Sequence, residues 1–138
     1  MPARDRIHEI VKNALIKDGW TITHDPFTIF FGKRALYADL GADKPLAAEK
    51  GTESIVVESK SFASQSEIYD LEHAIGQFVL YRVLMQNPLP NSKLFLAMPE
   101  IAFQSLFEDA IGLRIIEHVQ LKILTVDFNR AEIVRWVR

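Results

Sequence analysis

The stretch SIVVESKSF, residues 54–62, limits most strongly how this chain can fold. Its apolar beginning predicts a strand that is buried along most of its length, yet Glu58 and Lys60 follow before the strand ends. Side chains alternate across a strand, so Glu58 and Lys60 face one side while Val57 and Ser59 face the other. A sheet that contains this strand must therefore hold a carboxylate and an ammonium group at one end.

The whole chain fits one domain built around such a sheet. With 138 residues, of which 49% are hydrophobic, it is long enough for one core and short for two, so we expect a single domain over residues 1–138. It has no cysteine, which excludes a zinc–thiolate site and a cysteine nucleophile and fits a reducing compartment, by default the cytoplasm. No apolar run approaches the ~20 residues that span a bilayer, so we expect no membrane segment.

The N-terminal half predicts one helix followed by strands. Apolar residues at helical spacing, ended by Gly19 as a C-cap, predict a helix over residues 5–18. Turn residues, among them the pair Gly32-Lys33, then separate segments with strand character. We expect these segments to pair as an antiparallel meander of four strands: FTIFF, ALYADLGA, LAAEK and SIVVESKSF.

The C-terminal half predicts three helical segments and three strands. Ser64 and Glu67 form a capping box that opens a long helix ending near Met85. The continuous apolar strand KLFLAM is expected to be covered on both faces, and a helix begins near Pro99. A helical segment around Leu113 to His118 and two strands, LKILTVDF and AEIVRWV, complete the chain. The predicted order is α-ββββ-α-β-α-ββ, an α/β (α+β) fold with a mixed sheet flanked by helices.

Three charged residues on the predicted meander suit a metal site. The meander can bring Asp39 beside Glu58, and two carboxylates at a sheet end offer the oxygen ligands that Mg²⁺ or Mn²⁺ accepts. Such an ion polarises a phosphoryl oxygen, while Lys60 beside it can orient water or stabilise charge on the phosphate. A structural alternative stays open, in which these three residues form a salt-bridged sheet end without a ligand.

The long predicted helix favours the metal site. Asp70, His73, Gln77 and Tyr81 follow at spacings of three and four residues and form a polar stripe. A purely structural helix would show solvent-facing charges there. His73 and Tyr81 fit equally well as polar rim residues of a packed helix.

Together these residues resemble the motif of the PD-(D/E)XK nuclease superfamily, whose members share a restriction-endonuclease-like fold. The resemblance implies that Asp39 and Glu58 bind the metal, that Lys60 is the catalytic lysine, and that Gln77 supports the site from the helix. Ala38 stands where the motif's name has proline.

The same resemblance implies one more supporting residue, on the first helix. Members of the superfamily often carry a further acid there, counted back from the glycine that ends the helix. That count falls on His8, with Glu9 beside it. A helical wheel leaves the choice between the two residues open.

Four segments in order, DGWTITHDPF, YADLGAD, VVESKSF and AIGQFVLYRVL, resemble the XisH family of fdxN-element excision controlling factors, found mainly in cyanobacteria. The likeness runs from about Arg4 to Trp136. It implies a role in excising a DNA element with a site-specific recombinase and a companion protein, XisI, and it leaves room for a homo-oligomer.

Membership of this family does not by itself imply cleavage of DNA. Two functions are therefore expected: a metal-dependent endodeoxyribonuclease, and a catalytically silent regulatory module that acts through a partner. The net charge of −2 favours the second, since proteins that bind DNA through bulk charge carry a basic face.

Overall fold

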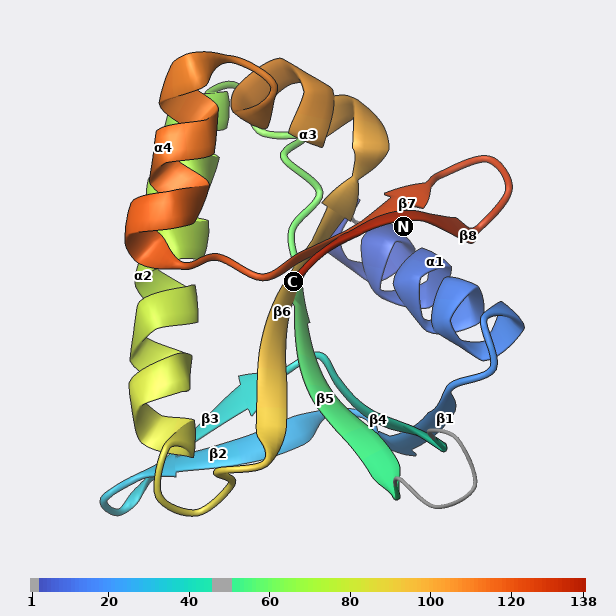
Figure 1. Cartoon of the computed structure of the whole chain (residues 1–138), viewed down its shortest axis with the longest axis vertical. Helices are drawn as coiled ribbons and strands as arrows, with labels where there is room; N and C mark the ends of the chain where they lie inside the picture. The colour runs from blue at the N-terminus through green and yellow to red at the C-terminus, as the bar shows by residue number, and fades with distance from the viewer. Residues whose placement is uncertain (1–2, 46–50) are drawn as a thin grey trace.

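The computed structural model describes residues 3–45 and 51–138, in which a six-stranded mixed sheet lies between helices (Figure 1). The pairings of β5 with β6 and of β6 with β7 are parallel, and the other three are antiparallel. This confirms the predicted mixed sheet. Its strands, in spatial order, are β1 (Thr21–His24), β4 (Leu40–Pro45), β5 (Thr52–Ser59), β6 (Ser92–Pro99), β7 (Ile123–Asp127) and β8 (Glu132–Val137).

Each face of the sheet carries its own hydrophobic core. Along β5, Ile55 and Val57 join a cluster that contains the apolar face of helix α1, whereas Val56 joins one that contains the apolar face of α2. Side chains that alternate along a strand thus enter two cores, one on each face of the sheet. This explains why the buried parts of β5 and β6 are apolar without interruption. The helices are α1 (Ala3–Lys17), α2 (Glu67–Met85), α3 (Glu100–Phe107) and α4 (Ala110–Val119).

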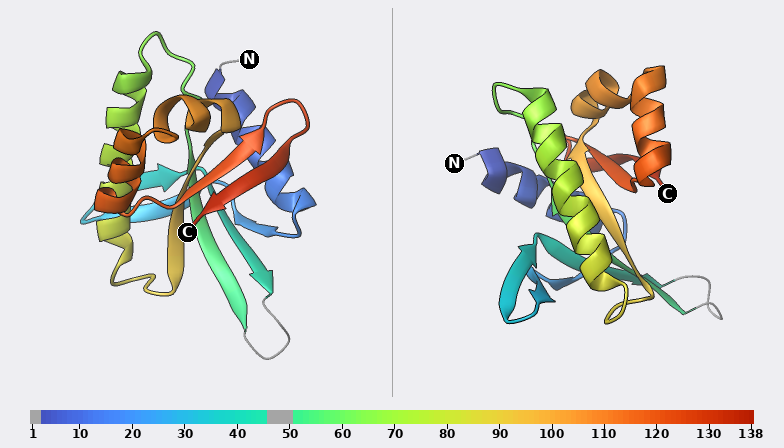
Figure 2. Two further views of the ribbon diagram at one scale, coloured as in Figure 1. Left: turned by 45° about the horizontal axis from the view of Figure 1, so that its top comes forward. Right: turned by 90° about the vertical axis from the view of Figure 1, so that its left-hand side faces the viewer.

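A small hairpin leaves the main sheet and lies against α2 (Figure 2). It consists of β2 (Phe27–Phe31) and β3 (Arg34–Ala38), which pair only with each other. The predicted turn at Gly32-Lys33 joins the two strands, and Gly32 has a φ of 59°.

The segment expected to form one strand over residues 35–42 instead forms two. Ala38 is buried in the cluster on the α2 side and Leu40 in the cluster on the α1 side. Residues two apart in a regular strand face the same way, so the chain has to leave the extended pattern between them. It does so at Asp39, which lies at the point where the chain crosses from the hairpin to the main sheet.

Two further predictions need correction. Strand β1 was not expected from the sequence, because it is short and mostly exposed. Ser66 caps α2 by accepting a hydrogen bond from the Tyr69 N–H, whereas Ser64, the predicted cap, donates to Asp70 at 2.7 Å. The strand expected for LAAEK, residues 46–50, lies outside the described residues.

The remaining predicted elements are present with small shifts at their ends. The first helix, the long helix, both C-terminal helical segments and the last two strands all form where the sequence places them. Within residues 3–45 and 51–138, no helix combines the length and the apolar character needed to cross a membrane.

Candidate functional site

Asp39 is buried and tightly held by the end of β5. Only 8% of the residue is exposed. Its Oδ2 atom accepts a hydrogen bond from the Ser59 N–H at 2.8 Å and a second from the Ser59 hydroxyl at 2.7 Å. Because β4 pairs with β5 from Leu40 onward, the crossing point at Asp39 is brought to the end of β5. The predicted approach of Asp39 to the Glu58-Ser59-Lys60 segment is therefore present.

Glu58 forms a carboxyl pair with Asp39. It is 4% exposed, and its carboxyl group hydrogen-bonds Asp39. Burial raises the pKa of Asp39, but hydrogen bonds from the Ser59 N–H, Glu58, the Ser59 hydroxyl and His8 outweigh burial and bring that pKa below its usual range. Asp39 is thus an ionised carboxylate at neutral pH, directly beside a second carboxyl group.

Lys60 projects from the end of β5 toward α2. Its N–H donates to the carbonyl of Ala97 at 2.9 Å, which continues the ladder with β6. Its Nζ atom lies 2.7 Å from Nδ1 of His73, so the ammonium group donates to the imidazole. Both side chains line a pocket of about 390 Å³, as does Ser59, whose hydroxyl donates to Asp39.

Gln77 lines the same pocket, one turn further along α2 than His73. Its Nε2 atom donates to the Tyr81 hydroxyl at 3.4 Å. Its Oε1 atom is buried and accepts no hydrogen bond from the part of the chain that the structure describes. The polar stripe of α2 thus faces the site, with Tyr81 buried behind it and Gln77 holding a buried acceptor at the pocket.

His8, on α1, links Asp39 to a second aspartate. Its Nδ1 atom lies 3.3 Å from Oδ1 of Asp39, and its Nε2 atom lies 2.8 Å from Oδ1 of Asp25. Lys12 binds the other oxygen of Asp25 at 2.7 Å and lowers the pKa of that carboxyl group. Glu9 is exposed on the helix, so the structure brings His8 to the site and leaves Glu9 outside it.

Sequence reasoning missed Ser59, Asp25 and the turn at Phe62. Ser59 is polar but unremarkable in sequence, and Asp25 stands out only through its place in DGWTITHDPF. Phe62 has a φ of 55°, an uncommon value for a residue with a side chain, and it is buried. This conformation turns the chain after Lys60 into a loop that lines the pocket, and such outliers gather at functional sites.

The donor set suits a hard divalent cation completed by substrate oxygens. Two adjacent carboxyl groups, Asp39 and Glu58, supply the oxygen ligands that Mg²⁺ prefers, and Mg²⁺ usually takes only one or two from the protein. No group of three or more His, Cys, Asp or Glu side chains could hold a metal ion by itself, as far as the described ranges extend.

The family model described as XisH protein matches residues 1–134. The structure is similar to an XisH family protein from Nostoc punctiforme PCC 73102, with 36% identity and a TM-score of 0.86 over 97% of this chain and 100% of that one. It is also similar to an fdxN element excision controlling factor protein from Anabaena variabilis, with 38% identity and a TM-score of 0.87 over 98% of this chain and 100% of that one. No match is found among curated protein sequences.

Proposed function

This chain belongs to the XisH family, and from that membership and the site we propose a controlling factor for DNA-element excision with a PD-(D/E)XK-type site for phosphodiester hydrolysis. The relative from Anabaena variabilis, named an fdxN element excision controlling factor, supports the role in excision. The buried pair of Asp39 and Glu58 beside the Lys60 pocket carries the chemical part of the proposal.

In this proposal Asp39 and Glu58 hold Mg²⁺ or Mn²⁺. A bound ion of this kind polarises a phosphoryl oxygen and lowers the pKa of bound water. The chain's own contribution is to hold the ligands in place. Ser59 fixes one oxygen of Asp39 through two hydrogen bonds, and His8 faces the other oxygen. Side chains locked in this way keep a site ready for its ligand.

Lys60 acts on the phosphate and on the attacking water. Its backbone is fixed by Ala97, and its ammonium group stands at the pocket next to His73. From there it donates to the water or to the non-bridging phosphate oxygens, which gain charge as the phosphorus becomes pentavalent. Gln77 supports the same pocket with its buried Oε1, which can accept a hydrogen bond from the ammonium group or from the water.

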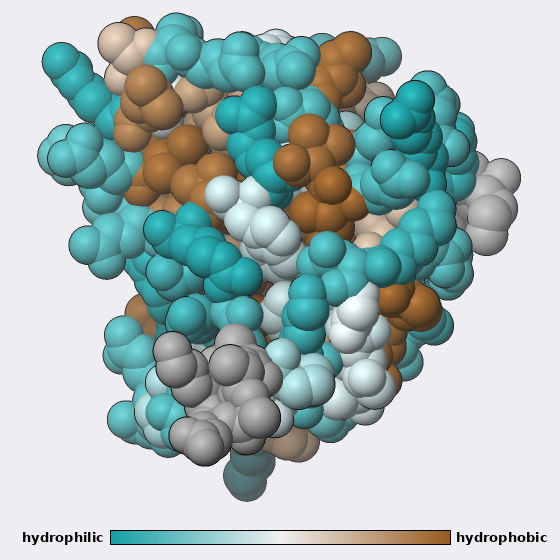
Figure 3. Space-filling view, turned by 45° about the vertical axis from the view of Figure 1, so that its right-hand side comes forward, coloured by the Kyte–Doolittle hydropathy of each residue, from teal (hydrophilic) through white to brown (hydrophobic). Residues whose placement is uncertain are grey.

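A second candidate function, a regulatory module that works through partners, is favoured by the exposed apolar surface. α2 leaves four large side chains more than 40% exposed, namely Ile68, Tyr69, Leu80 and Val83, and the hairpin exposes Phe30 to 68%. By contrast, the face drawn in Figure 3 shows hydrophobic residues as separate patches among hydrophilic ones. In this proposal the exposed side chains of α2 and the hairpin form the partner surface, since an exposed apolar patch marks a protein–protein contact. We propose DNA, a XisI-like companion and a recombinase as partners, with self-association as a further use of this surface.

A cleavage assay tests the catalytic proposal. Supercoiled and branched DNA are incubated with Mg²⁺ or Mn²⁺ and wild type, Lys60→Met or Lys93→Met. Lys93 is a matched control because it is a half-exposed lysine on β6 that pairs with Glu53. We expect Lys60→Met to lose at least about 100-fold in rate, since charge stabilisation at the phosphate is lost, and Lys93→Met to cleave like wild type.

The same assay separates the two candidate functions. Equal cleavage by wild type and Lys60→Met would reject the catalytic role of this site. If the pure chain cleaves no DNA, and it binds DNA only when the companion protein is added, the regulatory module is the correct function.

A further inference from the structure

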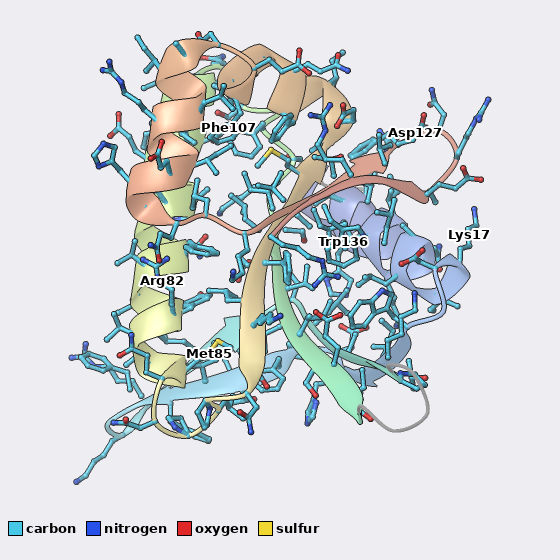
Figure 4. All side chains as sticks on the ribbon, in the orientation of Figure 1. Lys17, Arg82, Met85, Phe107, Asp127 and Trp136 are labelled. Atoms are coloured by element: carbon cyan, nitrogen blue, oxygen red, sulfur yellow. The ribbon has the colours of Figure 1, made fainter. Side chains whose placement is uncertain are left out.

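A second pocket opens at the same edge of the sheet as the candidate site. It measures about 520 Å³, within the range of roughly 300–1,000 Å³ that is typical of ligand sites. Ser61 and Ala63 line both this pocket and the Lys60 pocket, so the two are neighbours along one loop. The other walls come from α1, from α3 and from the end of β7 with the turn that follows it; Figure 4 labels Asp127, the last residue of β7.

The walls of this pocket combine a flat apolar surface with amide groups. Phe128 is half-buried, and the Arg6 guanidinium lies 5.8 Å from the centre of its ring. Ile101, which is 77% exposed, adds apolar surface, and the amides of Gln104 and Asn129 supply both donors and acceptors. A flat ring beside a guanidinium favours a planar π system, and amide side chains suit the polar edge of such a ring.

The acidic groups in the walls are already bonded within the protein. Asp127 accepts hydrogen bonds from the N–H groups of Asn129 and Arg130 at 2.8 and 2.9 Å. Both oxygens of Glu100 are bonded to Arg135, at 3.0 and 2.6 Å. These carboxylates serve the turn and the fold. The Nε2 atom of Gln104 also donates to Oε2 of Glu100 at 3.2 Å, which leaves Arg6, the Gln104 carbonyl oxygen and the Asn129 amide to meet a ligand.

We propose that this pocket binds an unpaired nucleobase of a DNA strand whose neighbouring phosphate lies in the Lys60 pocket. The inference rests on the proposed function, because it takes DNA as the ligand of the adjoining pocket. The base stacks on Phe128 and Arg6, and Gln104 and Asn129 contact its edge. One strand would then occupy both pockets, with the shared residues Ser61 and Ala63 under its backbone.

Binding of a base-bearing strand and an abasic strand tests this inference. Fluorescein-labelled oligo(dA) of about ten nucleotides and an abasic strand of the same length are titrated in EDTA at low salt, with anisotropy as the readout. Wild type is expected to prefer the base-bearing strand by about tenfold, as stacking of one base would give. Phe128→Leu keeps the apolar volume and loses the flat ring, so the preference should fall to within about twofold.

Phe31→Leu serves as the control, because Phe31 is a half-exposed aromatic residue on the hairpin, outside this pocket. It should keep the wild-type preference. Equal binding of the two strands by wild type, no binding of either strand, or an unchanged preference in Phe128→Leu would each overturn the inference. These measurements use neither metal nor cleavage. The base preference can therefore be confirmed even if the Lys60→Met assay rejects catalysis, and it can be rejected even if that assay supports catalysis.

Discussion

Two carboxylates near the same edge of the sheet, the buried Asp39 and the partly buried Glu100, are held in different ways. Glu100 receives Nε and Nη2 of Arg135 at 3.0 and 2.6 Å and the Thr125 hydroxyl at 2.8 Å. Asp39 receives the N–H and hydroxyl of Ser59 and faces His8, with Glu58 hydrogen-bonded beside it. Glu100 is thus paired with an arginine, whereas Asp39 lies beside another acid, Glu58.

The pKa values of the two groups reflect this difference. Burial raises the pKa of Glu100, but the hydrogen bonds from Arg135 and Thr125 and the arginine charge bring it below its usual range. The pKa of Asp39 also ends below its usual range, and there the groups that outweigh burial are hydrogen bonds. A fork of guanidinium and carboxylate stabilises a fold, while a pair of adjacent acids is the arrangement that a bound cation would stabilise.

The largest expected difference between the two carboxylates is in catalysis. Asp39→Asn should lower metal-dependent cleavage at least about 1,000-fold, because it removes one of the two protein ligands that we propose for the ion. Glu100→Gln should change the rate by less than about threefold, since Glu100 bonds to Arg135 and to the fold. Rates on the same branched substrate measure both effects. A similar fall in cleavage rate in the two variants would mean that Asp39 has no catalytic role that Glu100 lacks.

The free energy of unfolding should depend strongly on the Glu100 pair, which has little effect on cleavage. Arg135→Met removes the partner of a carboxyl group whose side chain is only 15% exposed, so we expect it to lower the free energy of unfolding by about 1–2 kcal/mol, after allowing for screening of the half-exposed arginine. Arg114→Met, at an exposed position of α4, is the control and should stay within about 0.5 kcal/mol. Urea unfolding at neutral pH measures both variants. If Arg135→Met leaves the free energy of unfolding unchanged, the ion pair of Glu100 and Arg135 does not contribute to stability.

The sequence predicted those features that depend on neighbouring residues. The apolar runs of β5 and β6 predict buried strands because two cores must be filled, and the structure confirms both. The approach of Asp39 to Glu58 follows from antiparallel pairing over a short distance along the chain. The polar stripe of α2 was equally readable, because helical periodicity places His73 and Gln77 on one side.

Other features depend on contacts that the sequence does not encode locally. The break at Asp39 arises because Ala38 and Leu40 are buried in different cores, and a local pattern cannot show which core each residue enters. Asp25 reaches His8 only after α1 has packed against β1. The choice between His8 and Glu9 was open for the same reason, since it depends on how α1 is rotated against the sheet.

Replacing Glu58 sharpens the contrast between a functional and a structural acid. Glu58→Gln should change the free energy of unfolding by less than about 0.5 kcal/mol in metal-free buffer, because an amide keeps the shape and donates to Asp39 as Glu58 does. Glu100→Gln should lower it, since the arginine loses its partner. Urea midpoints of the two variants give the comparison. A destabilised Glu58→Gln would show that the acid pair supports the fold.

The smallest expected difference concerns acid and salt. A lowered pKa means that each carboxylate contributes stability at pH values above its ordinary pKa of 3.8 or 4.5, and that this contribution is lost as the pH falls through the lower, folded-state value. The stability gaps between wild type and Asp39→Asn and between wild type and Glu100→Gln should therefore both narrow below about pH 4.

Salt at neutral pH should separate them. Raising NaCl from about 0.05 to about 0.5 M screens the partly exposed Arg135 and should narrow the Glu100 gap by about 0.5 kcal/mol. The Asp39 gap should stay constant, because the hydrogen bonds from Ser59 are buried and short. Equal salt dependence of the two gaps would mean that a nearby positive charge stabilises Asp39 as much as Arg135 stabilises Glu100. The pair of Asp39 and Glu58 would then already be neutralised, and the argument for a bound cation would fail.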